Sequence, residues 1–128
     1  MSTPARYQMP DPSVRLTDEL IMEHIEPESR VLDLGCGDGR LMWRLKKEMQ
    51  CRVQGVDVEF ANIVAVLDRG LPAIAGDLDR GLSEFPDSSF DYVVLSQTLQ
   101  QVRHPKSLLE EMLRIASRAF GCRTCCNV

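Results

Sequence analysis

The amino-acid sequence predicts an α/β fold in which helices cover both faces of a doubly wound, mostly parallel sheet. Three observations lead to this class. Short apolar segments alternate with segments of helical periodicity, the apolar segments are continuous rather than alternating, and a glycine cluster joins the first of them to a helix. Alternation of this kind favours parallel strand pairs joined by right-handed crossovers.

The first helix is expected to begin at Thr17, whose hydroxyl would cap the first turn while Leu16 packs on Ile21. Pro27 would stop the helix, because proline cannot donate a backbone hydrogen bond. Residues 1–15 contain three prolines and little periodic hydrophobicity, so they are expected to form an irregular leader.

Strands and helices then alternate along the chain. Leu41, Leu45 and Met49 recur at the four-residue spacing of a helix, Gly70 can end the next helix, and Pro105 is acceptable in the first turn of the last one. The expected strands are Val31–Leu34, Val53–Val56, Ala73–Ala75 and Tyr92–Leu95, and the expected helices are Arg40–Met49, Ala61–Leu67 and Leu108–Ile115.

The composition is that of an ordinary globular domain. The length of 128 residues fits one domain, and a net charge of −4 argues against a nucleic-acid partner, which would require clustered lysine and arginine. No apolar run is long enough to cross a bilayer, and the N-terminus lacks the hydrophobic segment of a secretory signal. We therefore expect no membrane association and a cytoplasmic location, where cysteines are reduced thiols.

The last seven residues contain Cys122, Cys125 and Cys126. This cluster could hold half of a zinc site, but a structural site requires four ligands and no second cluster is present. No metal site is therefore predicted.

A glycine cluster links the first strand to the following helix. Gly35, Gly37 and Gly39 have the strand–loop–helix context of a nucleotide-type binding loop, where glycine lets a ligand approach the backbone closely. Asp57 lies 22 residues after Gly35, at the end of the second strand, where its carboxylate can accept hydrogen bonds from both ribose hydroxyls. The pattern therefore predicts a site for a cofactor that contains ribose.

Two cofactors fit this pattern, NAD and S-adenosyl-L-methionine (SAM). In dinucleotide loops the third glycine follows the second by three residues, whereas here it follows by two. Asp33 and Asp38 also place carboxylates around the loop, which would repel a pyrophosphate but attract the ammonium and sulfonium groups of SAM. SAM is the predicted cofactor, and NAD is the weaker alternative.

Asp77 and Leu78 follow the third strand. Asp77 could accept a hydrogen bond from an adenine amino group while Leu78 packs on the ring. An equally good interpretation of this segment by itself is a pair of surface aspartates, Asp77 and Asp79, at a strand end.

Four segments together resemble the first four motifs of class I SAM-dependent methyltransferases: 31–39, 55–57, 76–78 and 90–95. The segment Leu95-Ser96-Gln97-Thr98-Leu99-Gln100 is more particular, and it resembles the MetW family of methionine-biosynthesis proteins within that superfamily. The resemblance covers residues 16–119, which are expected to form a SAM-binding, Rossmann-like methyltransferase domain.

The resemblance assigns roles to individual residues. The glycine loop would surround the methionine part of SAM, Asp57 would bind the ribose, and Ser96 with Gln97 would line the pocket beside the sulfonium. The complete set of predicted cofactor-binding residues is Asp33, Gly35, Cys36, Gly37, Asp38, Gly39, Asp57, Val58, Asp77, Leu78, Ser96 and Gln97.

Two functions are consistent with this resemblance. The MetW family implies an accessory subunit of methionine biosynthesis that acts with homoserine O-acyltransferase and binds SAM. The alternative is a SAM-dependent small-molecule methyltransferase, or an inactive fragment of one. No catalytic residue is predicted, because His24 and His104 have no convergent acid or nucleophile nearby in the sequence and no Asn/Asp-Pro-Pro-Tyr type motif follows the fourth strand.

The sequence departs from the family pattern at two places. Asp57 stands where related sequences often have glutamate. After Ala119 the family continues with a fifth strand and a Pro-Asn-Phe-Gly type segment, whereas residues 120–128 are an atypical, Cys-rich tail that suggests truncation. Without a fifth strand, Phe90–Leu95 would form an unprotected sheet edge, so the chain is expected to be marginally stable, aggregation-prone or dependent on a partner.

Overall fold

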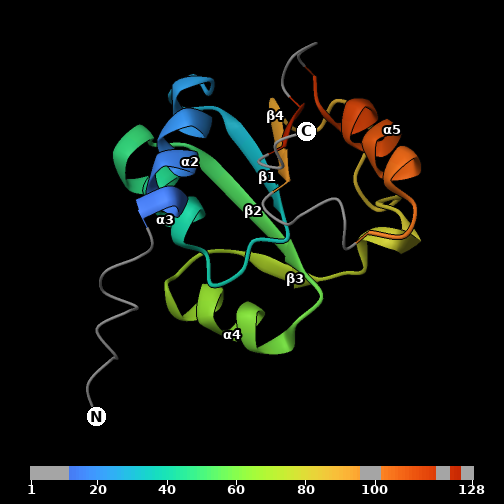
Figure 1. Ribbon diagram of the computed structural model, residues 1–128, viewed down its shortest axis with the longest axis horizontal. Coiled ribbons are helices and arrows are strands. Elements are labelled where there is room, and N and C mark those ends of the chain that lie inside the picture. Colours follow the sequence, from blue (N-terminus) through green and yellow to red (C-terminus); the bar gives the residue numbers. More distant parts are fainter. Residues whose placement is uncertain (1–11, 96–101, 118–121, 125–128) are drawn as a thin grey trace.

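The computed structural model describes residues 12–95, 102–117 and 122–124 (Figure 1). In chain order the elements are α2 (Pro12–Glu23), β1 (Arg30–Leu34), α3 (Arg40–Met49), β2 (Arg52–Asp57), α4 (Phe60–Asp68), β3 (Ala73–Ala75), the 3-10 helix η1 (Leu78–Arg80), β4 (Tyr92–Leu95), α5 (Pro105–Ile115) and β5 (Cys122–Thr124). No described helix is long and apolar enough to span a membrane.

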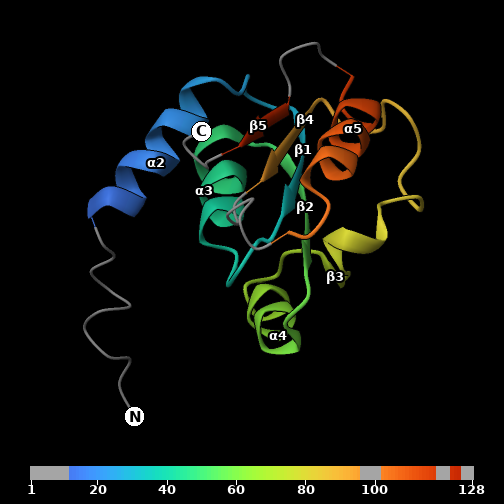
Figure 2. The ribbon, with the colours of Figure 1, turned by 45° about the vertical axis from the view of Figure 1, so that its right-hand side comes forward.

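The strands form one parallel sheet in the order β3-β2-β1-β4-β5. Figures 1 and 2 show α2 and α3 on one side of this sheet and α5 on the other, so the doubly wound α/β class predicted from the sequence is confirmed.

The register of the central strands produces two separate cores. Val31 on β1 lies opposite Val53 on β2 and Tyr92 on β4, and these three side chains belong to the core beneath α2, α3 and α4. The neighbouring residues Leu32 and Val93 face the other way and pack in the core beneath α5. Because side chains alternate across a strand, both faces of β1 are buried, as the continuous apolar runs predicted.

Helix α2 begins at Pro12, so the expected start at Thr17 is wrong. Proline is tolerated in a first helical turn. Asp18, next to the expected cap, lies within α2 along the chain. Its side chain is buried and pairs with Arg40 on α3. A second ion pair between the same helices joins Arg44 to Glu19 at 3.0 Å.

The expectation of an unpaired edge at β4 is also wrong. Cys122–Thr124 in the tail form β5, which pairs in parallel with Val93–Leu95. Short apolar runs are the signal by which strands are predicted, and Cys-Arg-Thr does not contain one. The boundaries 16 and 119 of the domain stay a prediction, with α2 and β5 extending beyond them at either end.

Candidate cofactor site

The glycine loop begins where β1 ends. The amides of Gly35 and Cys36 both donate to the carbonyl oxygen of Val56, at 2.7 and 3.1 Å, which ties the loop to the end of β2. Gly35, Gly37 and Gly39 have φ values of 72°, 58° and 87°, a left-handed conformation that side chains disfavour. The loop therefore requires glycine at these positions for its own backbone path, and Gly39 leads directly into α3.

Asp57 is fixed at the centre of the site. It is the last residue of β2, is only 4% exposed, and accepts hydrogen bonds from the Gly37 amide at 2.9 Å and the Glu59 amide at 2.8 Å. The side-chain amide of Asn62, on α4, donates to the same carboxylate at 3.2 Å. A carboxylate has about four acceptor positions, so these three donors hold its orientation and leave capacity for a ligand.

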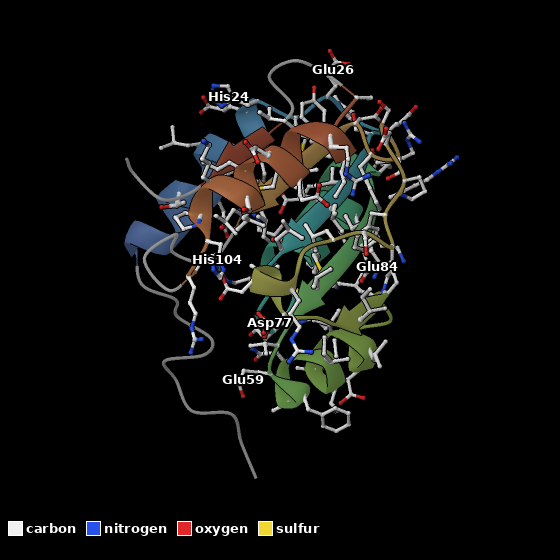
Figure 3. The ribbon with its side chains drawn as sticks, turned by 90° about the vertical axis from the view of Figure 1, so that its right-hand side faces the viewer. His24, Glu26, Glu59, Asp77, Glu84 and His104 are labelled. Atoms are coloured by element: carbon white, nitrogen blue, oxygen red, sulfur yellow. The ribbon has the colours of Figure 1, made fainter. Side chains whose placement is uncertain are left out.

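A pocket of about 220 Å³ opens beside Asp57, at the carboxyl ends of β1, β2 and β3. Open parallel sheets bind their ligands at this end of the strands. Figure 3 shows Glu59 and Asp77, which come from different elements, at this end of β2. The lining residues are Gly35, Asp57, Val58, Glu59, Asn62, Gly76, Asp77, Leu78, Asp79 and Val102.

The segment after β3 supplies one wall of the pocket. The Asp77 carboxylate accepts the Asp79 amide at 2.9 Å and so caps η1. Asp79 in turn accepts the amides of Arg103 and His104, at 2.7 and 3.0 Å. This contact brings the residues before α5 to the pocket, where Val102 lies.

The pocket is acidic and partly apolar. Its lining includes four carboxylates and the side chains of Val58, Leu78 and Val102. The carboxylates would repel a pyrophosphate but suit hydroxyl donors and cationic groups, and the apolar side chains suit a ring. Among the described residues, no group of three histidine, cysteine or acidic side chains could hold a metal ion.

Cys36 lies in the loop, and its surroundings favour the protonated thiol. Burial, reinforced by the carboxylates of Asp33 and Asp57, raises the pKa of its thiol to about 12. The thiol is therefore protonated at neutral pH, and the reactive species of cysteine is the thiolate.

Neither histidine lines the pocket. Figure 3 shows His24 well away from Glu59 and Asp77, and its Nδ1 lies 2.8 Å from the Leu20 carbonyl oxygen. His104 precedes α5, with Nδ1 3.6 Å from Asp79. His104 therefore lies next to a lining residue without lining the pocket itself.

Five of the predicted residues line the pocket together: Gly35, Asp57, Val58, Asp77 and Leu78. Gly37 does not line the pocket, but its amide donates to Asp57, which does. The Asp38 carboxylate lies 3.6 Å from Arg69 and is not part of the lining. Asp33, on β1, and Cys36, in the loop, are buried and do not line the pocket, and a Cβ on Gly39 would lie 3.0 Å from Val66 on α4. Ser96 and Gln97 lie outside the described residues.

The sequence analysis missed five lining residues: Glu59, Asn62, Gly76, Asp79 and Val102. Glu59 and Asn62 follow Asp57 closely, and a helix beginning directly after the acidic strand end was an available signal for both. Gly76 and Asp79 flank the predicted pair Asp77 and Leu78. Nothing in the local sequence marks Val102, which reaches the pocket through the tertiary contact with Asp79.

A glycine loop, an acidic strand end and a pocket at the carboxyl ends of parallel strands, on this sheet, are features of the Rossmann-like fold that class I SAM-dependent methyltransferases share. Comparison with known proteins identifies the family within this class. The sequence model of the methionine biosynthesis protein MetW matches residues 15–122. The chain therefore belongs to the MetW family, as the sequence resemblance predicted.

The relatives share this fold and part of this sequence. A bifunctional methionine biosynthesis protein MetXA/MetW from Rhodopirellula baltica is 39% identical over 118 residues, which are 86% of this chain and 19% of that protein. A chain from a complex of the Haloferax volcanii Trm112 methyltransferase activator with a methyltransferase is 26% identical, with a TM-score of 0.70, over 78% of this chain and 46% of that one.

The fold also matches phosphoethanolamine N-methyltransferase 2 from Haemonchus contortus, solved in complex with SAM. The TM-score is 0.67 at 24% identity, over 79% of this chain and 25% of that one. This chain thus spans less than half the length of each of these three proteins.

Proposed function

We propose that the pocket binds SAM. The buried Asp57 carboxylate carries the proposal, because three protein donors hold it at the pocket wall with capacity to accept from the ribose hydroxyls. Asp77 and Leu78 would contact the adenine. The loop Gly35–Gly39, with Asp33 nearby, would surround the methionine part, and Ser96 with Gln97 would lie beside the sulfonium.

The biochemical role proposed is that of a MetW-type accessory subunit in methionine biosynthesis, acting with homoserine O-acyltransferase in the cytoplasm. Family membership supports the pathway. The bifunctional MetXA/MetW relative supports the partner, because MetXA and MetW are joined there in one chain. SAM would then be an effector bound by the accessory subunit.

The alternative function is methyl transfer from SAM to a small molecule. The match to a SAM-bound N-methyltransferase favours it, although that likeness is one of fold. Bound SAM would supply a sulfonium methyl group, and this chain's own contribution would be to orient the cofactor through Asp57 and exclude water through Val58, Leu78 and Val102.

Calorimetric titration with SAM and S-adenosylhomocysteine tests the cofactor proposal. Asp57→Ala removes a charged acceptor and should weaken binding of both by about 1.5–3 kcal/mol. Asp87→Ala is a matched control, because Asp87 is an exposed aspartate that pairs with Arg114 away from the pocket. Equal affinities for the Asp57 variant and the wild-type chain would contradict the ribose assignment.

Two assays separate the proposed role from its alternative. An acyltransferase assay with and without this chain should show higher acyltransferase activity or stability in its presence. Formation of S-adenosylhomocysteine from SAM with an added acceptor, and no effect on the acyltransferase, would favour the methyltransferase.

A further inference from the structure

Helix α4 is apolar on both of its sides. Of its nine residues only Asn62 and Asp68 are polar, and the Asn62 amide is engaged with Asp57. Ile63 and Val66 lie on the inner side of α4, toward the sheet, and both are buried. A surface helix normally carries polar residues opposite its buried stripe, and a helix that is apolar all round is normally buried all round.

The outer face of α4 consists of Phe60, Val64 and Leu67. Their spacing of four and three residues places them on one stripe of the helix. They are 75%, 41% and 53% exposed, respectively. Figures 1 and 2 both show α4 at one end of the molecule, with no other described element over its outer side.

The charges at the two ends of α4 indicate what kind of surface can cover this face. Glu59 directly precedes the helix and Asp68 is its last residue, and neither forms an ion pair with the described part of the chain, whereas the next residue, Arg69, is paired with Asp38 at 3.6 Å. In a symmetric pair of two copies, antiparallel helices would place Glu59 of one against Asp68 of the other, and parallel helices would place like residues together. Both arrangements oppose negative charges, so a partner with a basic rim fits better than a second copy.

We propose that the outer face of α4 is the docking surface for homoserine O-acyltransferase, through an apolar patch with a basic rim. This inference rests on the proposed function for the identity of the partner. The MetXA/MetW relative supports a close association, since it carries both parts in one chain. The surface also adjoins the pocket, because Glu59 and Asn62 line it from the same end of α4.

The chain provides a matched pair of substitutions to test this surface. Leu67 and Leu113 are 53% and 58% exposed, and each lies two residues or fewer from the end of its helix, α4 and α5 respectively. Leu67→Gln and Leu113→Gln therefore make the same chemical change at equivalent exposure. Binding of each full-length variant to the purified acyltransferase of the same organism is measured by biolayer interferometry, with thermal denaturation of each variant alone.

The expected result is a rise in Kd of about tenfold or more for Leu67→Gln and less than about twofold for Leu113→Gln. If Leu67→Gln lowers Tm, Val64→Gln one turn earlier should give the same rise in Kd. Asp68→Lys should weaken binding in low salt and less so in high salt, because screening reduces the contribution of a rim charge.

Three results would overturn the inference. A tight complex that neither Leu67→Gln nor Val64→Gln weakens would place the docking surface elsewhere and leave the proposed function intact. A wild-type chain that does not bind the acyltransferase at all would remove the proposed partner and this surface together. A dimer of the chain alone, seen by sedimentation and lost in Leu67→Gln only, would identify a second copy as the occupant.

Discussion

Asp18 and Asp91 are two aspartates whose pKa values shift in opposite directions. The hydrogen bonds from Arg30 to Asp91, with the Nη2–Oδ1 distance at 3.1 Å, lower the pKa of the Asp91 carboxyl below its ordinary value of 3.8. Burial raises the pKa of Asp18 above 3.8, although Arg40 lies against it. Asp91 therefore favours the folded state when ionised, whereas the buried Asp18 resists ionisation there.

The two residues should consequently respond differently to neutral substitution. The contribution of Asp91 to stability is fully present above pH 3.8 and is lost as the pH falls through its lower folded-state pKa. For Asp18 the pH dependence of stability has the opposite sign. Its contribution is present at low pH, where the carboxyl is neutral, and is lost as the pH rises through its raised folded-state pKa. We expect Asp91→Asn to lower the free energy of unfolding at pH 7, and Asp18→Asn to lower it less or to raise it.

Urea denaturation at pH 7 and at pH 3 measures both variants against the wild-type chain. The deficit of Asp91→Asn should narrow at pH 3, because below pH 3.8 the unfolded wild-type chain takes up a proton at Asp91 that the folded chain binds only at lower pH. A deficit that is the same at both pH values would show that the Asp91 contribution is not ionic.

At the scale of elements, strands and helices with a local signal could be predicted closely. Arg40–Met49 and Tyr92–Leu95 have the predicted bounds, because helical spacing and a continuous apolar run mark them. The predicted start of α2 is too late, because Thr17 has the features of a cap although Pro12 is a residue that the first turn of a helix accommodates. In the site, Val102 could not be predicted, because it reaches the pocket through the contact of Asp79 with the residues before α5.

Gly55, on β2, lies at a position where the surrounding core leaves little room for a side chain. A Cβ at this position would lie 2.7 Å from Met42 Sδ and 2.8 Å from Cys36 Sγ. Both sulfur atoms belong to buried side chains of the core beneath α3. Gly55→Ala should therefore lower the free energy of unfolding by about 1–3 kcal/mol through overpacking.

Gly70→Ala is the matched control for this substitution. Its Cβ would meet no heavy atom within 4 Å, and its φ is 79°, so the cost should be that of a left-handed alanine, about 1 kcal/mol. Both are read from urea denaturation curves. A cost at Gly55 no greater than the cost at Gly70 would mean that Met42 and Cys36 move aside easily.

At the scale of the whole molecule, stability should depend on the tail. β5 pairs with Val93–Leu95, and the side chains of β4 are at most 1% exposed. Deleting residues 120–128 would leave β4 as an apolar edge strand, which can pair with another chain. We expect this deletion to lower the urea midpoint and to cause aggregation that increases with concentration, as measured by light scattering.

Deleting residues 125–128 alone is the control, because it leaves Cys122–Thr124 in place. This shorter deletion should behave as the wild-type chain does. If both deletions behave alike, whether stable or aggregating, the pairing of β5 with β4 is not what protects that strand.

The Asp79 carboxylate also has a consequence for the order of folding. It accepts the two amides just before α5, those of Arg103 and His104, across 24 and 25 residues of chain. This anchor forms only after the intervening loop has closed, and closing the loop costs conformational entropy. The wall of the pocket is therefore completed no earlier than this long-range contact, in the same step that holds the residues before α5 in place.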